Sequence, residues 1–389
     1  MNRNISLLLA GAMLPALSLT AQTTNSGAPL DEKSLFEEVS GIKKKTDKFN
    51  VYLNTHADFK ADFTGNEFDG GKFEMKQLRL EMRGNINDWI TYRYRQRLNK
   101  GEGPGGNFDN VLQSIDVAEV GFRVGKVDFV AGKQCASYGG IEFDLNPIEV
   151  YDYCDMIENM SNFMTGLRVV YDFAPGQQMQ FQVLDGVTRS SEAMYGVIRT
   201  AKLPLVYTIN WNGTICPAWN TRWSASFMNE TYKEHMWYYA LGNDFHFTDR
   251  FGAYFDWMYS REGIDRKGLI TGIVGDRDGH NALNADYMSF VLHLNYFVAP
   301  RWNVFAKGSY ETAGVSKSEE NVHKGNYRTT WTYTAGVEFY PLKERNLHFF
   351  LAYVGRNYKY KSDVCAQYGV SDYNTNRVSA GFIWQIPVF

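Results

Sequence analysis

Beyond its first 21 residues, the sequence has no apolar run long enough for a membrane-spanning helix, which needs about 20 such residues. It also has few prolines (10) and few cysteines (4) among its 389 residues. Neither sign of charge dominates, because the formal net charge is −3. General nucleic-acid-binding proteins are usually strongly basic, so we do not expect nucleic acid as a partner.

Residues 1–21 have the three parts of a secretory signal peptide. Arg3 supplies a positive charge, residues 5–19 are apolar, and Ala21 is a small residue at a cleavage position. The apolar stretch is too short for a membrane anchor, and Gly11 and Pro15 interrupt it. We therefore expect export and cleavage after Ala21.

Aromatic residues are abundant, with 26 Phe, 25 Tyr and 9 Trp, and they alternate with polar residues. From Phe49 to Phe63 every second residue is apolar or small, and the residues between them are mostly polar. Similar alternation recurs at 90–98, 251–260, 327–339 and 377–386. Soluble strands average 5–6 residues, whereas a tilted membrane strand needs about 9–11. The pattern predicts an all-β fold, a transmembrane antiparallel β-barrel with an apolar outer face.

The expected barrel has about sixteen strands, whose connections alternate in length. Short turns are expected near 84–88, 125–126, 174–177, 212–217, 248–250, 299–301 and 341–345. Longer connections are expected near 64–72, 99–110, 136–163, 186–202, 261–284, 312–326 and 360–374, with one short exception at 230–234. Bacterial barrels have short periplasmic turns and longer outer loops, which places both termini in the periplasm. A soluble β-sandwich or propeller, the main alternative, would show shorter strands or a fixed repeat.

Residues 22–48 precede the barrel and have a different pattern. They are rich in charge, and Leu35, Val39 and Ile42 recur at roughly helical spacing. We expect a short periplasmic helical segment, which serves either as a contact between subunits or as a solvated lead-in to the barrel.

The four cysteines have no metal-ligand spacing, and we expect no metal and no cofactor. An exported protein can form disulfides, and the expected topology separates periplasmic Cys216 from outer Cys365. Cys135 and Cys154 are the pair that this topology allows to bond. The alternative is four unpaired thiols.

Two stretches resemble the phosphate-selective porin O and P family, in its Bacteroidetes branch. They are residues 73–84, Phe-Glu-Met-Lys-Gln-Leu-Arg-Leu-Glu-Met-Arg-Gly, continuing through 89–95, and residues 130–134 with 138–143. The resemblance implies a sixteen-stranded, trimeric porin of the bacterial outer membrane. Its surroundings would be membrane lipid and lipopolysaccharide, and its cargo small hydrophilic solutes or anions.

A basic wall is expected inside the barrel. Six arginines fall on predicted lumen faces: Arg79, Arg83, Arg93, Arg95, Arg97 and Arg168. A ladder of guanidinium groups in a water-filled lumen attracts anions. The alternative is that these arginines pair with acids across the strands.

The connection 138–162 carries acids and neither Lys nor Arg: Glu142, Asp144, Glu149, Asp152, Asp155 and Glu158. Loops of this length are usually functional, and in porins such a loop folds into the barrel to form the constriction. We expect it to face Arg79, Arg83, Arg93 and Arg95, which would create the transverse field of a general-diffusion pore. A constriction dominated by basic groups would instead indicate an anion- or phosphate-selective pore.

No enzyme is expected from the sequence. The run Gly101–Gly106 satisfies G-x-G-x-x-G, but it contains a proline and has no helix after it. His56 with Asp58 suggests a hydrolase, but spacing assigns no serine partner. The leading hypothesis is passive diffusion through a pore, and the alternative is a barrel that binds surface ligands.

The signal peptide gives a first prediction. Amino-terminal sequencing of protein extracted from the membrane should begin at Gln22, because a peptidase cuts after the small residue Ala21. A sequence that begins at Met1 would contradict the predicted export.

Overall fold

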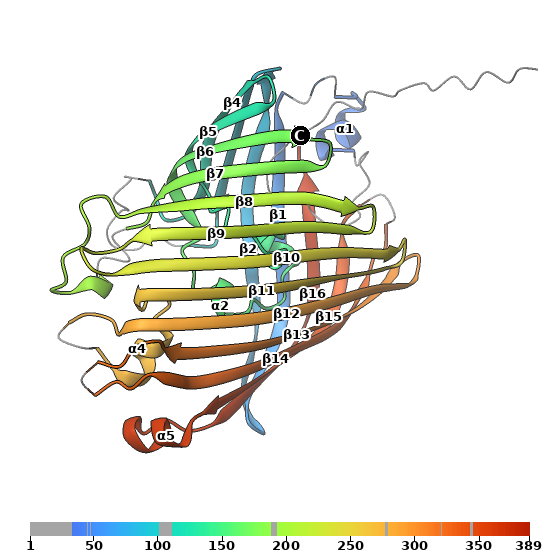
Figure 1. The fold of residues 1–389 in the computed structure, drawn as a ribbon. Coiled ribbons are helices and arrows are strands. Elements are labelled where there is room, and N and C mark those ends of the chain that lie inside the picture. Colours follow the sequence, from blue (N-terminus) through green and yellow to red (C-terminus); the bar gives the residue numbers. More distant parts are fainter. Residues whose placement is uncertain are drawn as a thin grey trace, which may run out of the picture.

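The alternating segments form sixteen antiparallel strands that close into one barrel in the computed structural model (Figure 1). The structure describes residues 33–44, 46, 48–100, 111–187, 193–276, 279–319, 321–342 and 345–389. The expected fold class is therefore confirmed. The strands are β1 (Asn50–Thr64), β2 (Glu67–Asn87), β3 (Ile90–Arg97), β4 (Ile115–Val124), β5 (Val127–Cys135), β6 (Phe163–Ala174), β7 (Gln177–Asp185), β8 (Leu205–Cys216), β9 (Trp219–Asn229), β10 (His235–Thr248), β11 (Phe251–Ile264), β12 (Leu283–Ala299), β13 (Trp302–Val315), β14 (Gly325–Phe339), β15 (His348–Tyr360) and β16 (Tyr373–Pro387).

The barrel closes where β1 pairs with β16, and each strand turns one face outward. Phe59 and Trp331 are exposed on the outer surface, whereas the neighbouring inward residues His56 and Thr330 are almost fully buried. An apolar outer face suits lipid, and closure leaves no strand edge with unpaired backbone groups around the ring. The two faces follow directly from the period of two in the sequence.

Connections at one end of the barrel are short, and most at the other end are longer. Gly125 adopts a positive φ of 63° in the tight turn between β4 and β5. The expected long connection at 64–72 is wrong. Strand β2 begins at Glu67, directly after a two-residue turn. Its glycines and charges resemble a loop, but Phe73 pairs across the hairpin with Phe59, and their ring centroids lie 5.0 Å apart.

The helices are short: α1 (Leu35–Ser40), α2 (Asp155–Glu158), α4 (Leu269–Val274) and α5 (Ser362–Tyr368) are α-helices, and η1 (Glu142–Asp144), η2 (Pro147–Glu149) and η3 (Ala193–Tyr195) are 3₁₀ turns. In the described part of the chain, no helix is long and apolar enough to cross a membrane. Figure 1 shows α2 inside the barrel, whereas α4 and α5 lie at the end away from the C-terminus.

Helix α1 lies beside the C-terminus at the end of the barrel that carries the short turns (Figure 1). Ser34 and Glu37 form a capping box at its start. The ring of Phe36 lies 4.9 Å from that of Phe389, whereas Val39 and Ile42 are exposed to solvent. The apolar face expected from helical spacing is therefore not the face that packs. The signal peptide at 1–21 and the glycine-rich run at 101–106 lie outside the described residues.

Candidate functional site

The connection between β5 and β6, residues 136–162, lies inside the barrel and is called the inserted segment below. Its main chain contacts inward-facing side chains from opposite sides of the ring. His56 on β1 donates from Nδ1 to the carbonyl of Ile148 (2.7 Å), because a carbonyl can only accept. On β11, Asp256 accepts the backbone N–H of Ile141 (2.7 Å). A segment that contacts both strands must occupy the lumen.

The start of the inserted segment fits closely against β9, β10 and β11. The two oxygens of Asp256 accept the N–H groups of Ile141 and Glu142 at 2.7 and 2.8 Å. Gly242 on β10 has no side chain, so the backbone of Gly140 can approach. A Cβ at Gly242 would lie 2.7 Å from the Cα of Gly140 and 2.8 Å from the nitrogen of Ile141. These contacts fix where the segment turns into the lumen.

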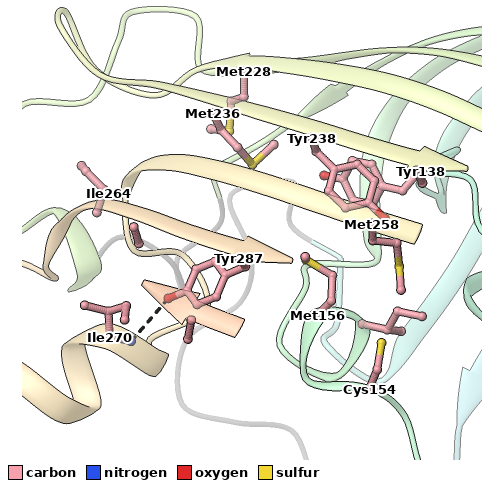
Figure 2. Close-up of a cluster of buried hydrophobic side chains, with 14 of the residues drawn as sticks. Tyr138, Cys154, Met156, Met228, Met236, Tyr238, Met258, Ile264, Ile270 and Tyr287 are labelled. Carbon is pink, nitrogen blue, oxygen red and sulfur yellow. Dashed lines mark hydrogen bonds between the residues drawn. The ribbon is translucent and has the colours of Figure 1, made fainter. Parts of the chain in front are cut away.

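Apolar side chains fill the space between the inserted segment and β9 to β12. Tyr138 and Met156 of the segment pack into one buried cluster with Met228, Tyr238 and Met258 of the wall (Figure 2). Inward positions of a water-filled barrel are normally polar. Apolar residues on both faces of these strands therefore indicate, in the sequence itself, that another part of the chain packs against them inside the barrel. The Met-Trp-Tyr-Tyr-Ala-Leu run of β10 shows this pattern. The segment therefore packs on this wall as on a protein core.

Ion pairs hold most of the acidic side chains of the inserted segment to the barrel wall. Glu142 pairs with Lys307 at 2.7 Å, and Asp144 with Arg222 at 2.8 Å. Further pairs connect Asp152 with Arg356 (2.6 Å) and Arg377 (3.0 Å), and Asp155 with Arg328 (2.5 Å) and Arg356 (2.9 Å). Glu158 is exposed. The cationic partners lie on β9 and on β13 to β16.

Two acids show how this pairing acts on ionisation. Burial raises the pKa of Asp152, but Arg356 and Arg377 outweigh burial and hold it below its ordinary value. Glu149 has a weaker partner, His348 at 3.7 Å. Burial, together with the charge of nearby Glu338, raises the pKa of Glu149 to about 7, although His348 acts in the opposite direction. Asp152 is therefore anionic near neutral pH, and Glu149 is partly protonated.

The six arginines expected in the basic wall form a separate cluster on β2, β3 and β6. Arg79, Arg95 and Arg97 surround Asp116 on β4, with contacts of 3.2, 3.6 and 2.8 Å. Arg83 and Arg93 pair with Glu81 at 3.7 and 3.0 Å, and Arg168 pairs with Glu119 at 3.5 Å. Pairing across the strands, the alternative considered for these arginines, is what the structure shows.

The expectation that the acidic segment faces Arg79, Arg83, Arg93 and Arg95 holds only in part. Burial raises the pKa of Asp144, and the charges of Arg222, Arg93 and Arg168 act in the opposite direction, so Asp144 lies within electrostatic reach of the basic wall. In the described residues, every ion pair of the segment goes to β9 or to the strands from β13 to β16. The physical reason is competition. Neighbouring strands already supply the arginines with carboxylates a few residues away, and the apolar side of the segment is buried against β9 to β12.

Two β-bulges explain why charged groups point inward where simple alternation fails. Lys76 is the extra residue of β2 between pairs His56–Gln77 and Ala57–Met75, and its ammonium group donates to the carbonyls of Val150 (3.1 Å) and Tyr151. Asp116 is likewise the extra residue of β4 against β3. A bulge re-aims a side chain, so one holds the segment and the other organises the arginines.

The Cys135–Cys154 disulfide considered from the sequence does not form, because all four cysteines are free thiols. Cys154 precedes α2 and is fully buried, and its N–H donates to Glu142 Oε1 at 3.1 Å. Cys135 ends β5, and its carbonyl accepts from Gln182 at 3.0 Å. Each cysteine is fixed by its own backbone contacts.

Sequence reasoning missed the residues that hold the segment, namely Arg222, Lys307, Arg356 and Asp256. All of them are inward residues of the barrel strands, so the direction of their side chains was predictable from alternation. Their partners in the inserted segment were not predictable, because pairing depends on which side of the lumen the segment follows. Among the described residues, no group of three or more His, Cys, Asp or Glu residues could hold a metal ion.

Comparisons with known proteins agree with this architecture. A family model described as phosphate-selective porin O and P matches residues 49–386. The outer membrane channel DcaP of Acinetobacter baumannii is 12% identical, with a TM-score of 0.60 over 88% of this chain and 99% of that chain. An in-vitro folded, trimeric form of OmpT from Vibrio cholerae is 11% identical, with a TM-score of 0.53 over 87% and 100%.

An anion-selective porin from Comamonas acidovorans is 9% identical, with a TM-score of 0.54 over 87% of this chain and 99% of that chain. No curated protein matches the sequence. At these identities the solved structures show a shared barrel fold.

The close fit at Gly242 gives a testable prediction. Replacing Gly242 by Val should push the inserted segment off the wall, because the added atoms meet backbone that cannot move aside as a flexible side chain can. Overpacking of this kind costs about 1–3 kcal/mol. Hydrogen exchange of the Ile141 and Glu142 amides should become faster.

Gly308 on β13 is the matched control, because it is exposed and a Cβ there would meet no atom within 4 Å. Gly308→Val should leave exchange of the two amides unchanged. Equal protection of these amides in wild type and Gly242→Val would show that Gly242 does not position the segment.

Proposed function

The chain belongs to the phosphate-selective porin O and P family, and from this premise we propose that its pore passes anions more readily than cations. The protein is an outer-membrane porin that lets small hydrophilic solutes diffuse passively through a β-barrel. Selectivity is the further step, and it is argued from the arginines of the basic wall that water reaches.

The observation that carries the proposal is the unequal pairing of charge on the two sides of the lumen. On one side, the acids of the inserted segment are matched by arginines and lysine of the wall. On the other side, Arg97 and Arg79 share Asp116 at 2.8 and 3.2 Å, and Arg83 lies 3.7 Å from Glu81. One carboxylate cannot neutralise two guanidinium groups, so this part of the basic wall retains positive charge. Fixed positive charge along a pore raises the local concentration of anions.

Arg83 and Arg97 present this charge to water. Their side chains are 31% and 27% exposed, whereas Arg79 and Arg95 are almost fully buried. Guanidinium groups bind oxyanions such as phosphate through paired N–H donors. This chemistry supports the alternative of a phosphate-selective pore within the broader anion preference. The transverse field of a general-diffusion pore has less support, because the ion pairs described for the acids go to β9 and to β13 to β16.

We further propose that the protein has no enzymatic activity. The histidine suggested for a hydrolase, His56, is buried, and its Nδ1–H is engaged with the carbonyl of Ile148. Its interaction supports a structural role in holding the inserted segment. Hydrolysis of ester or phosphoester substrates by the purified protein would contradict this proposal.

Arg83 and Arg97 should control selectivity. Each charge contributes about 0.6 kcal/mol to the energy of an ion ~7 Å away in water, with opposite sign for an anion and a cation. The double variant Arg83→Gln/Arg97→Gln should therefore lower the anion-to-cation permeability ratio about sevenfold at low salt for each charge removed. The reversal potential across a planar bilayer with a KCl gradient measures this ratio. The difference should shrink at 1 M salt, where the screening length is about 3 Å.

Arg250 is a matched control, because it is an exposed arginine in the short turn between β10 and β11. Arg250→Gln should leave the reversal potential unchanged. A pore that is cation-selective in the wild type would refute the anion preference. Ligand binding at the outer loops without any conductance would favour the surface-binding alternative.

A homotrimer is the oligomeric state we propose. The family resemblance and the trimeric form of OmpT, which shares the fold, support it. Light scattering of the detergent-extracted protein, corrected for bound detergent, should give three times the mass of one chain. A mass of one chain at all protein concentrations would exclude the trimer.

A further inference from the structure

A cavity of about 230 Å³ lies between the inserted segment and strands β1, β15 and β16. It is on the outer side of the segment, because Asp62 and Thr375 lie near the end of the barrel at which most connections are longer, such as the one between β15 and β16. Its lining combines both signs of charge with two amide or hydroxyl groups: Asp62, Phe63, Asp69, Asp152, Val354, Arg356, Thr375, Asn376 and Arg377. Three of these residues, Asp152, Arg356 and Arg377, are joined by ion pairs described above.

Asp62 and Arg377 face each other directly across β1 and β16, but they do not pair. Residues opposite one another in an antiparallel sheet have Cβ atoms about 4.5–5.5 Å apart, so an Asp and an Arg there usually close a contact. Here Arg377 turns through Nη2 to the carbonyl of Tyr151 (2.9 Å) and to Asp152 (3.0 Å). The inserted segment thus draws the guanidinium away from Asp62 and leaves the cavity between them.

Both groups keep capacity for a ligand. The Asp62 side chain is 42% exposed, and its cationic neighbour Lys60 lies 3.7 Å away. The Arg377 side chain is 25% exposed, and in the described residues its Nε and Nη1 atoms have no hydrogen-bond partner. The cavity therefore offers a carboxylate on one side and free guanidinium donors on the other.

A β-bulge adds a second carboxylate to the Asp62 side. Asp62 pairs with Gly70 and Phe63 pairs with Phe68, so Asp69 is the extra residue of β2 and joins the lining. Its Oδ2 accepts the hydroxyl of Thr64 at 2.8 Å. On the opposite side, Arg356 lies behind Asp152 and reinforces the positive charge. The charges are therefore sorted across the cavity.

We propose that this cavity is a binding site for small zwitterions, of the size of an amino acid or a dipeptide. The ligand carboxylate binds the free donors of Arg377, and the ligand ammonium group binds Asp62 and Asp69. Val354 provides apolar contact for the part between them. The cavity is smaller than the roughly 300–1,000 Å³ of drug-sized pockets, which suits such a solute. The inference rests on the proposed function, since it names a solute held in the outer part of that pore.

Ion current through the protein in a planar bilayer tests the site with three matched probes. Glycylglycine carries both charges, N-acetylglycylglycine only the carboxylate, and glycylglycinamide only the ammonium group. Glycylglycine should interrupt the current at concentrations at least tenfold below those of the two singly charged probes, because it alone makes both charge-assisted contacts. Equal effects of the three probes would overturn the proposal.

Two variants separate the two ends of the ligand. Asp62→Asn should weaken the effect of glycylglycine about tenfold and leave that of N-acetylglycylglycine unchanged. Arg377→Gln should weaken the effects of both glycylglycine and N-acetylglycylglycine on the current. Because Arg377 also holds Tyr151 and Asp152, Asp62→Asn is the decisive variant, since Asp62 makes no described contact with the inserted segment.

Asp372 serves as the control, because it is an acid at the outer rim that pairs with Lys359 at 2.8 Å and does not line the cavity. Asp372→Asn should retain the wild-type response. Titration calorimetry of detergent-solubilised protein with glycylglycine measures the same affinity without requiring current. A protein that conducts KCl but neither binds nor responds to glycylglycine overturns this inference alone, whereas absence of conductance contradicts the proposed function.

Discussion

Charged groups buried inside the barrel need oppositely charged partners. The path of the inserted segment through the lumen depends on which partners its acids find. Breaking one side of a buried ion pair typically costs about 3–5 kcal/mol, because the remaining charge is left without compensation. The inserted segment brings Glu142, Asp144, Asp152 and Asp155 into the lumen, and each finds a cation on the wall. These pairs determine the side of the lumen that the segment follows.

The same requirement divides the lumen into two unlike parts. Where the segment packs on β9 to β12, methionine and tyrosine side chains form a core without room for a charged solute. On the side of β2, β3 and β6, arginines gather around carboxylates of adjacent strands. A segment that bound the arginines instead would neutralise this wall, so its position and the proposed selectivity are consequences of one arrangement.

β-Bulges in β2 and β4 direct three charged side chains to positions that regular strands would not give them. Three β-bulges place Asp69, Lys76 and Asp116 where regular alternation would not. Lys76 holds the segment, Asp116 organises arginines, and Asp69 lines the outer cavity. Arg377 connects these regions, because its contact with the segment separates it from Asp62. The barrel thus supplies a regular scaffold, and local irregularities determine where charged side chains lie inside it.

The sequence by itself determined the barrel, its sixteen strands and the inward face of each, because a period of two in a lipid-facing strand leaves one choice of face. It also identified the arginines and the acidic connection. Only the tertiary structure decided their partners. Ion pairing between Glu142 and Lys307 or Asp152 and Arg356 joins residues more than 150 positions apart, and spacing along one chain carries no information on which side of a lumen a long loop follows. The hairpin at 64–72 was misjudged for the same reason, and the sequence left open whether Cys135 and Cys154 bond, since each depends on contacts formed after the chain has folded.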